Sequence, residues 1–183
     1  YLHRRGPCSR AFGMFDGERL VGVVCYGTPS SAPLRKGVCG PGEELNVVEL
    51  TRLWISDECP KNSESRLIGA TLALCGKEIV VSFADPTAGH VGTVYQATNW
   101  LYTGLSAKRT NWTFDGNDRH GQSVADKYTS EEVRVMPGFR LEPRPQKHRY
   151  IYFNTKSKRR KLELMDKLRY PILPYPKKRT HTS

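Results

Sequence analysis

Long apolar stretches are missing from this sequence. No run of apolar residues reaches the roughly 18 that a membrane-spanning helix needs, and no signal peptide is recognisable. We therefore expect a protein of the cytoplasm that has no membrane as a partner.

Paired cysteines are missing as well. Five cysteines are scattered along the 183 residues and none belongs to a C-x-x-C motif, so neither a disulfide framework nor a zinc ribbon is indicated. The five histidines also lack metal-ligand spacing. These residues predict no metal site.

Acidic residues are scarce in the last quarter of the chain. Residues 140–183 hold 14 lysines and arginines against 3 acidic residues, whereas residues 1–139 hold 15 of each kind. Because clustered cations release counterions from phosphates, this segment predicts a polyanionic partner, and its interleaved tyrosines favour nucleic acid. A solubilising charged surface is the plainer alternative.

The pattern of apolar and turn-forming residues is typical of a mixed α/β domain with a central sheet flanked by helices. Asp16-Gly17 between two apolar runs predicts a hairpin over 11–27, and the stretch 28–44, rich in Pro and Gly, predicts a loop. The other expected strands are 46–56, 77–85, 100–107 and 149–154. The expected helices are 66–76, one that begins near Val91 and one within 156–169.

The expected organisation is a catalytic domain, 1–155, followed by a basic helix and proline-rich tail, 156–183. The polar stretch 106–148 would be an insert in the domain. Alternation along 46–56 predicts one sheet face with Val47, Glu49, Thr51 and Leu53 and the other with Val48, Leu50, Arg52 and Trp54.

Reactive side chains gather near the predicted crossovers. Arg52 lies on one strand and Asp85 just beyond the next, while Tyr95 and Asn99 share a face of the following helix. Ligands of open α/β sheets bind outside the carboxyl ends of the strands, so these residues should converge on one cleft. Asp85 would deprotonate an exocyclic amine and Tyr95 would donate a proton. A turn residue and a packed aromatic are the plainer interpretations.

The predicted helix start at 62–69 suits a phosphate group, because free backbone N–H groups point out of a helix amino terminus. The cofactor-binding candidates are Asn62, Ser63, Arg66, Gly69 and Asn99. Arg66-x-x-Gly69-x-Thr71 approximates the R/Q-x-x-G-x-G/A loop that binds acyl-coenzyme A and departs from it at the last position. An ordinary helix cap explains this stretch equally well.

Nucleic-acid contacts are expected from the insert and the basic extension. Arg119 and His120, near Trp112 and Phe114, combine charge with stacking surface and would probe a groove or hold an extruded base. A surface hairpin with a buried tryptophan explains them equally well. The other basic candidates are Arg109, Lys147, Arg149, Lys158, Arg159, Arg160 and Lys161.

Three stretches that cover most of the chain resemble the Mom family of phage DNA-modification proteins. They are VVELTRLWISDECPKNSESRLIGATL, SFADPTAGHVGTVYQATNWLYTGLSAKR and EPRPQKHRYIYF with LRYPILPYPK. The resemblance implies an α/β fold related to the GCN5-related N-acetyltransferases. It implies conversion of adenine in double-stranded DNA to N6-carbamoylmethyladenine, which shields phage DNA from host restriction endonucleases in the host cytoplasm.

The resemblance also implies roles for individual residues. Tyr95 stands where these acetyltransferases carry a tyrosine that protonates the departing thiolate. The implied catalytic residues are Arg52, Ser65, Asp85 and Tyr95, and Tyr1 and Tyr26 are further candidates, Tyr26 as a nucleic-acid contact.

The donor of the transferred group stays open. Acyl transfer from acetyl-coenzyme A would leave an amide on N6, whereas the modification is joined through its methylene carbon. Either a metal or redox step activates a methyl carbon, or the donor carries glycine, as glycyl-tRNA does. Iron has been proposed for the family, but the sequence shows no two-His-one-carboxylate triad.

Two other functions stay open on the same residues. One is an ordinary N-acetyltransferase that uses acetyl-coenzyme A on protein or small-molecule amines. The other is a non-catalytic DNA-binding protein of the same fold. No pattern in the sequence indicates the oligomeric state.

Overall fold

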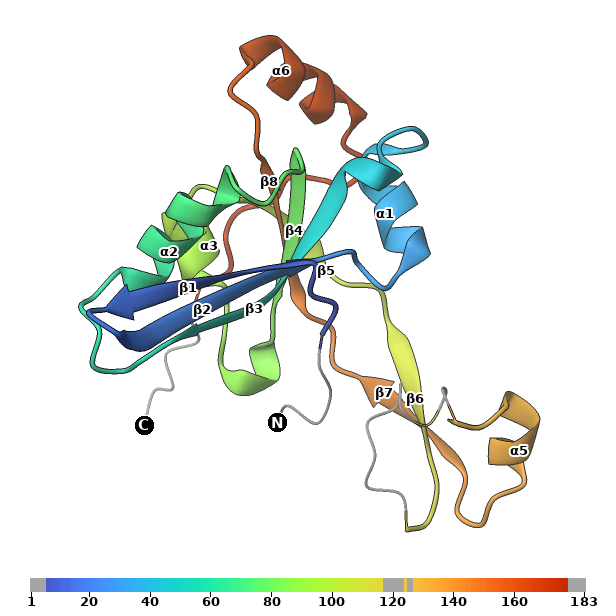
Figure 1. Ribbon diagram of the computed structural model, residues 1–183. Coiled ribbons are helices and arrows are strands. Elements are labelled where there is room, and N and C mark those ends of the chain that lie inside the picture. The colour runs from blue at the N-terminus through green and yellow to red at the C-terminus, as the bar shows by residue number, and fades with distance from the viewer. Residues whose placement is uncertain (1–5, 117–123, 125–126, 178–183) are drawn as a thin grey trace. The chain divides into compact units, whose positions relative to one another are not determined.

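The computed structural model describes residues 6–116, 124 and 127–177 (Figure 1). The chain forms two compact units. The described part of the larger unit consists of residues 6–105 and 147–177, and the described part of the smaller unit lies within 106–146.

A six-stranded sheet is the centre of the larger unit, with the order β1-β2-β3-β4-β8-β5. Its strands are β1 (Arg10–Asp16), β2 (Arg19–Gly27), β3 (Val47–Ile55), β4 (Ile79–Ala84), β8 (His148–Phe153) and β5 (Leu101–Leu105). Only β3 and β4 run parallel to each other, and every other neighbouring pair in this sheet is antiparallel. The predicted hairpin and the predicted mixed α/β sheet are confirmed.

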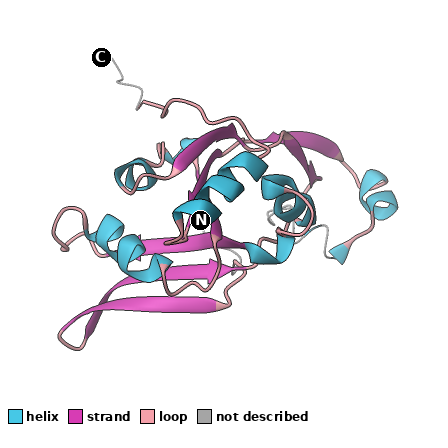
Figure 2. Ribbon diagram, turned by 90° about the horizontal axis from the view of Figure 1, so that it is seen from above, coloured by secondary structure: helices cyan, strands magenta, loops and turns pink. Residues whose placement is uncertain are grey.

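Helices cover both faces of this sheet, as Figure 2 shows with helices in cyan and strands in magenta. They are α1 (Ala32–Cys39), α2 (Ser63–Leu72), α3 (Thr93–Ala97) and α6 (Lys158–Lys167), and short 3-10 turns lie at η1 (Glu44–Asn46) and η2 (Pro86–Ala88). Leu67 and Ile68 of α2 and Tyr95 of α3 pack into one core cluster. Val38 of α1 and Leu164 of α6 pack into the other.

The loop predicted over 28–44 is wrong in part, because it contains α1. Ser31 caps this helix and accepts a hydrogen bond from the Leu34 N–H at 3.3 Å, and Pro33 lies in the first turn. Serine and proline are turn residues, but they also favour the start of a helix. The composition of this stretch therefore does not distinguish a loop from the start of a helix.

Strict alternation along β3 is also wrong beyond Leu50. Cys25 of β2 lies opposite Arg52 whereas Tyr26 lies opposite Leu50, so β3 carries one extra residue, Thr51, in a β-bulge. The bulge reverses the alternation, and Leu53 therefore packs against the same core cluster as Leu50. This single residue exchanges the predicted faces of Arg52, Leu53 and Trp54.

The described part of the smaller unit contains a two-stranded ribbon and a short helix. The strands are β6 (Arg109–Thr113) and β7 (Arg140–Arg144), which pair antiparallel, and the helix is α5 (Ser130–Arg134). A capping box between Thr129 and Glu132 begins α5.

The last described segment, residues 168–177, is called the C-terminal strap below. The Leu173 N–H donates to the Tyr102 carbonyl on edge strand β5 at 2.9 Å, and the ring of Tyr170 lies 3.5 Å from the Arg149 guanidinium. Both α6 and the strap belong to the larger compact unit. The division expected at residue 155 stays a prediction.

Candidate functional site

The two parallel strands separate halfway along their length. Their ladder runs from Val47 opposite Ile79 to Leu50 opposite Ser82 and ends there, although β3 continues to Ile55. The bulge at Thr51 directly follows the last paired residue. The carboxyl ends of β3 and β4 therefore diverge at the position where open α/β sheets bind their ligands.

Tyr95 reaches this point from α3. Its phenol lies 2.7 Å from the Ser82 hydroxyl, which is also 3.0 Å from the Leu50 carbonyl. Because a carbonyl can only accept, the Ser82 hydroxyl donates its proton to the Leu50 carbonyl. The Tyr95 phenol then donates its own proton to the Ser82 oxygen. Burial raises the pKa of Tyr95 to about 12, with a further increase from Glu49 and an opposing effect of the bond to Ser82. At neutral pH Tyr95 is a protonated phenol.

Glu49 is a half-buried acid on β3, opposite Val81 of β4 and one residue before Leu50, the last residue of the ladder. Burial raises the pKa of its carboxyl group, against the lowering effects of the positive charges of Lys147 and Arg52. Within the described part of the chain the Glu49 carboxylate has no hydrogen-bond or ion-pair partner. The sequence analysis assigned it no role, although a glutamate between Val48 and Leu50 in a covered strand is a signal that could have been used.

Asp85 ends β4 and has a different environment. It caps η2, accepting from the Thr87 backbone N–H at 3.0 Å and the Thr87 hydroxyl at 2.6 Å, and it pairs with the Lys147 ammonium at 3.0 Å. Burial opposes its ionisation, but the bonds from Thr87 and Lys147 outweigh burial and lower the pKa of the Asp85 carboxyl group. A carboxylate of this kind is a poorer proton acceptor than Glu49.

The other predicted catalytic residues are Arg52 and Ser65. Arg52 lies close enough to Glu49 for its charge to lower the pKa of that carboxyl group, and the Ser65 hydroxyl bonds within its own helix turn. Arg52 is an exposed residue beside the bulge, and its guanidinium donates to the Thr51 carbonyl at 2.7 Å. The Ser65 hydroxyl donates to the Asn62 carbonyl at 2.9 Å, within the first turn of α2. Glu49 is therefore the group that connects Arg52, Lys147 and Tyr95 electrostatically.

The cofactor-binding candidates do not line a single cavity. Asn62, with a left-handed φ of 70° before α2, lines a cavity of about 380 Å³ together with Asp57 and Lys61. Gly69 lines a separate cavity of about 390 Å³. The Ser63 side chain is buried and donates to the Pro60 carbonyl at 2.7 Å. Arg66 and Asn99 are exposed.

Two of the predicted nucleic-acid contacts are buried. Tyr26 is 0% exposed and its hydroxyl lies 2.9 Å from the Thr71 hydroxyl. Arg149 is 8% exposed and donates to the Thr103 hydroxyl and carbonyl at 2.9 and 2.7 Å. These side chains hold the core together and do not present a surface to a phosphate backbone.

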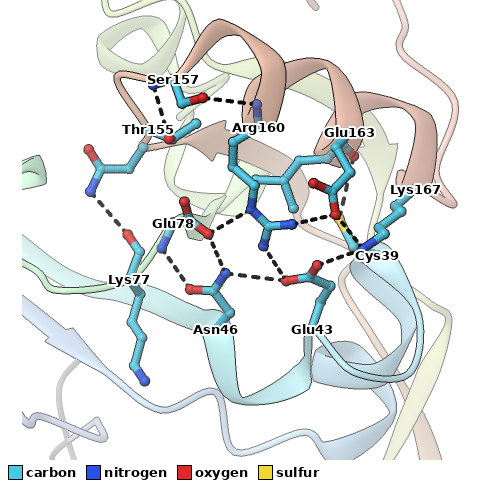
Figure 3. A network of polar contacts seen from close by, with 12 residues as sticks. Cys39, Glu43, Asn46, Lys77, Glu78, Thr155, Ser157, Arg160, Glu163 and Lys167 are labelled. Atoms are coloured by element: carbon cyan, nitrogen blue, oxygen red, sulfur yellow. Dashed lines mark hydrogen bonds and ion pairs between the residues drawn. The ribbon is translucent and has the colours of Figure 1, made fainter.

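The Arg160 guanidinium forms ion pairs with carboxylates within the protein, as Figure 3 shows. It contacts Glu43 at 2.7 Å, Glu78 at 2.9 Å and Glu163 at 2.7 Å. Lys167 adds contacts to Glu43 at 3.0 Å and Glu163 at 2.7 Å. The hydrogen bonds from Arg160, opposed by burial and assisted by Lys167, lower the pKa of Glu43 to about 2. We call this cluster the α6 network.

The remaining basic candidates have exposed positions or lie outside the described residues. Lys158, Arg159 and Lys161 are exposed on α6, and Arg109 is exposed on β6. The predicted residues outside the described part are Tyr1, Arg119 and His120. Lys147 is half-buried at its ion pair with Asp85.

The described residues contain no group of three or more His, Cys, Asp or Glu side chains placed to bind a metal ion. Within the same described residues, no helix has the length and apolar character needed to cross a membrane.

The geometry described so far defines a mixed α/β protein with a polar site where its two parallel strands diverge. A model of the Mom protein family matches residues 1–177. The chain is also 33% identical over 192 residues to the methylcarbamoylase Mom of Escherichia phage Mu, covering 97% of this chain and 72% of that protein. The chain belongs to the Mom family.

Solved structures with a similar arrangement are described as acetyltransferases. One, from Salmonella typhimurium with acetyl-coenzyme A, is 9% identical over 80% of this chain and 65% of that chain, slightly under two thirds of its length, at a TM-score of 0.45. Another, from Bacillus subtilis with coenzyme A, is 10% identical over 78% of this chain and 75% of that chain, at a TM-score of 0.44. The likeness is distant and does not identify the transferred group.

Proposed function

We propose that this chain is a DNA-modifying transferase that converts adenine in double-stranded DNA to N6-carbamoylmethyladenine. Family membership and identity to a protein named a methylcarbamoylase support a transfer of this kind. The observation that carries the proposal is the electrostatic interaction of a half-buried carboxylate, Glu49, with a protonated phenol, Tyr95, next to the point where β3 and β4 diverge. DNA modified in this way would resist the restriction endonucleases of a phage host, in whose cytoplasm the protein would act.

The proposed first step is attack by adenine N6 on an electrophilic carbon of the donor. A paired adenine has its N6 hydrogen-bonded and covered, so the base must first leave the helix. N6 forms the new C–N bond and loses one proton, which the Glu49 carboxylate accepts. The bond to the departing group breaks with its electron pair on that group, and the Tyr95 phenol protonates it. Ser82 holds the phenol in place for this transfer.

Both donors named above present a departing group that needs a proton. Acetyl-coenzyme A would release a thiolate and leave an acetyl amide. Glycyl-tRNA would release a ribose oxygen and leave a glycyl amide, an isomer of the carbamoylmethyl group. Its conversion would break the bond of N6 to the carbonyl carbon and that of the amine to the methylene carbon, and would form the bonds of N6 to the methylene carbon and of the amine to the carbonyl carbon. The described residues contain no group of three or more His, Cys, Asp or Glu side chains that fits iron. The two proton transfers of this step are assigned to Glu49 and Tyr95.

The start of α2 would hold an anionic part of the donor. Its free backbone N–H groups lie at the positive end of the helix dipole, which favours negative charge. Lys61 and Asn62 line the adjacent cavity of about 380 Å³. The DNA backbone would be held by exposed cations, of which Lys158, Arg159 and Lys161 on α6 are the nearest together in sequence. The smaller unit offers Arg109 as a further phosphate contact.

The test is mass spectrometry of nucleosides from plasmid DNA after expression of the chain in a bacterium. We expect an adenosine with the mass of the carbamoylmethyl product, and fragmentation separates that product from its glycyl isomer. Unmodified DNA from well-folded protein would contradict the proposal. An acetylated amine on protein or a small molecule would instead support the ordinary N-acetyltransferase, and DNA binding without any product would support the non-catalytic alternative.

A further inference from the structure

The C-terminal strap passes from one side of the sheet to the other. The Arg169 N–H donates to the Val38 carbonyl at 2.9 Å, and Tyr170 packs against the core cluster beneath α1 and α6. Leu173 then bonds to β5 at the sheet edge. Beyond that edge, the Tyr175 hydroxyl donates to the Trp100 carbonyl at 2.8 Å. Residues 168–177 therefore connect the face that carries α6 to the face that carries α3.

The end of the strap contacts both aromatic neighbours of Tyr95. The ring of Tyr95 lies 5.0 Å from the ring of Trp100 and 5.2 Å from the ring of Tyr150. Tyr175 bonds to the backbone of Trp100 and lies 6.5 Å, ring to ring, from Tyr150. The backbone N–H of Trp100 in turn donates to the Tyr95 carbonyl at 3.0 Å. Two separate chains of contact thus lead from one strap residue to Tyr95.

A third connection reaches α3 itself. The Gln96 amide lies 3.2 Å from the Pro176 carbonyl of the strap, 3.2 Å from the Val91 carbonyl and 3.1 Å from the Tyr150 hydroxyl. Helix α3 has five residues, and a helix of one turn is not stable without tertiary contacts. The orientation of α3 therefore depends on what packs around it, and the strap is part of that surrounding.

We propose that the C-terminal strap is a positioning element of the reaction site, with Tyr175 as its principal positioning residue. It holds α3 so that the Tyr95 phenol meets the Ser82 hydroxyl where β3 and β4 diverge. This inference rests on the proposed function for its catalytic consequence, but its structural part can be measured alone. Tyr175 itself touches neither the substrate nor the reacting atoms.

The first test compares two conservative variants of the strap. Tyr175→Phe keeps the ring and removes the hydrogen bond to Trp100. Tyr170→Phe, the matched control, removes a hydroxyl from the same strap on the opposite face of the sheet. We expect amide hydrogen exchange of residues 93–97 to accelerate about tenfold in Tyr175→Phe, the loss expected for one neutral hydrogen bond, and to stay unchanged in Tyr170→Phe. Equal exchange in both variants overturns the inference, whatever reaction the protein catalyses.

The second test asks whether Tyr175 acts through Tyr95. With a fixed amount of folded protein, Tyr175→Phe should lower the turnover number about tenfold and leave the KM for DNA unchanged, because a misplaced catalytic group slows the chemical step. In a Tyr95→Phe background the same change should have no further effect. Additive losses in the double variant, or a loss that follows only the fraction of unfolded protein, contradict the inference. If the wild type modifies no DNA, the proposed function fails while the exchange result still decides the positioning role.

Discussion

The two ends of the β3–β4 pair differ in how their acidic residues are satisfied. At the amino end, Glu43 and Glu78 are bound by Arg160 in the α6 network, and Asn46 bridges them with bonds of 3.3 and 2.9 Å. At the carboxyl end, where the strands diverge, Asp85 is paired with Lys147, but the Glu49 carboxylate has no such partner among the described residues. The paired carboxylates of the α6 network hold α6 to the sheet, whereas the half-buried Glu49, whose pKa is raised, is a candidate functional group.

The largest effect is expected at Glu49. Glu49→Gln removes the proton acceptor and should lower the modification rate by about 10²–10⁴-fold, the usual contribution of a general base. Asp85→Asn is the matched control, because it changes the neighbouring carboxylate, whose pKa is already lowered by Thr87 and Lys147. Rates are measured as modified adenosine per unit time with folded protein of equal amount. A greater loss in Asp85→Asn would assign the base to Asp85, as the sequence analysis predicted.

The paired end should respond in stability and not in rate. Glu43→Gln leaves Arg160 and Lys167 without their shared buried partner and should lower the free energy of unfolding by about 3 kcal/mol, as expected for one broken buried pair. Glu49→Gln should leave stability unchanged or raise it slightly, because it removes an unpaired buried charge. Urea unfolding of both variants measures this difference. Equal destabilisation by the two changes would remove the distinction between the ends.

Acid should weaken the paired end in a defined direction. The pKa of Glu43 is about 2 in the folded protein against 4.5 for the ordinary group, so its contribution to stability is complete above pH 4.5. That contribution is lost as the pH falls from 4.5 towards 2, because the unfolded chain binds the proton first. The stability difference between wild type and Glu43→Gln, followed by urea unfolding, should therefore shrink over this window. A difference that is constant with pH would contradict the assignment.

The smallest effect is expected on the exposed face of α6. Replacing Lys158, Arg159 or Lys161 singly by Ala should reduce the slope of log affinity against log salt by about 1 for each phosphate that is no longer neutralised. Truncation of residues 156–183 is a poorer test, because it removes Leu164 and the strap from the core. Titration of duplex DNA at several salt concentrations gives the slopes. An unchanged slope in all three variants would show that DNA binds to another surface of the protein.

Much of the fold was predictable, because it depends on neighbours along the chain. The hairpin at Asp16-Gly17 and the order of the expected strands and helices were predicted from local periodicity and are confirmed, whereas α1 was missed. The bulge at Thr51 was missed, because one inserted residue leaves the apolar pattern of β3 nearly unchanged. The roles of Tyr26 and Arg149 were missed for another reason: residue type alone does not reveal that a tyrosine or arginine is enclosed by distant segments.

The amino-acid sequence by itself determined the membership of the Mom family, the α/β class and the excess of positive charge at the carboxyl end, because motifs, periodicity and composition are properties of the chain in order. Only the tertiary structure decided which charged side chains are paired within the protein and which can contact a ligand. Arg160 is bound by Glu43, 117 residues earlier in the chain, and Glu49 acquires its raised pKa from burial between β2 and β4. Desolvation and ion pairing act between atoms close in space, so they follow from folding and cannot be read along the sequence.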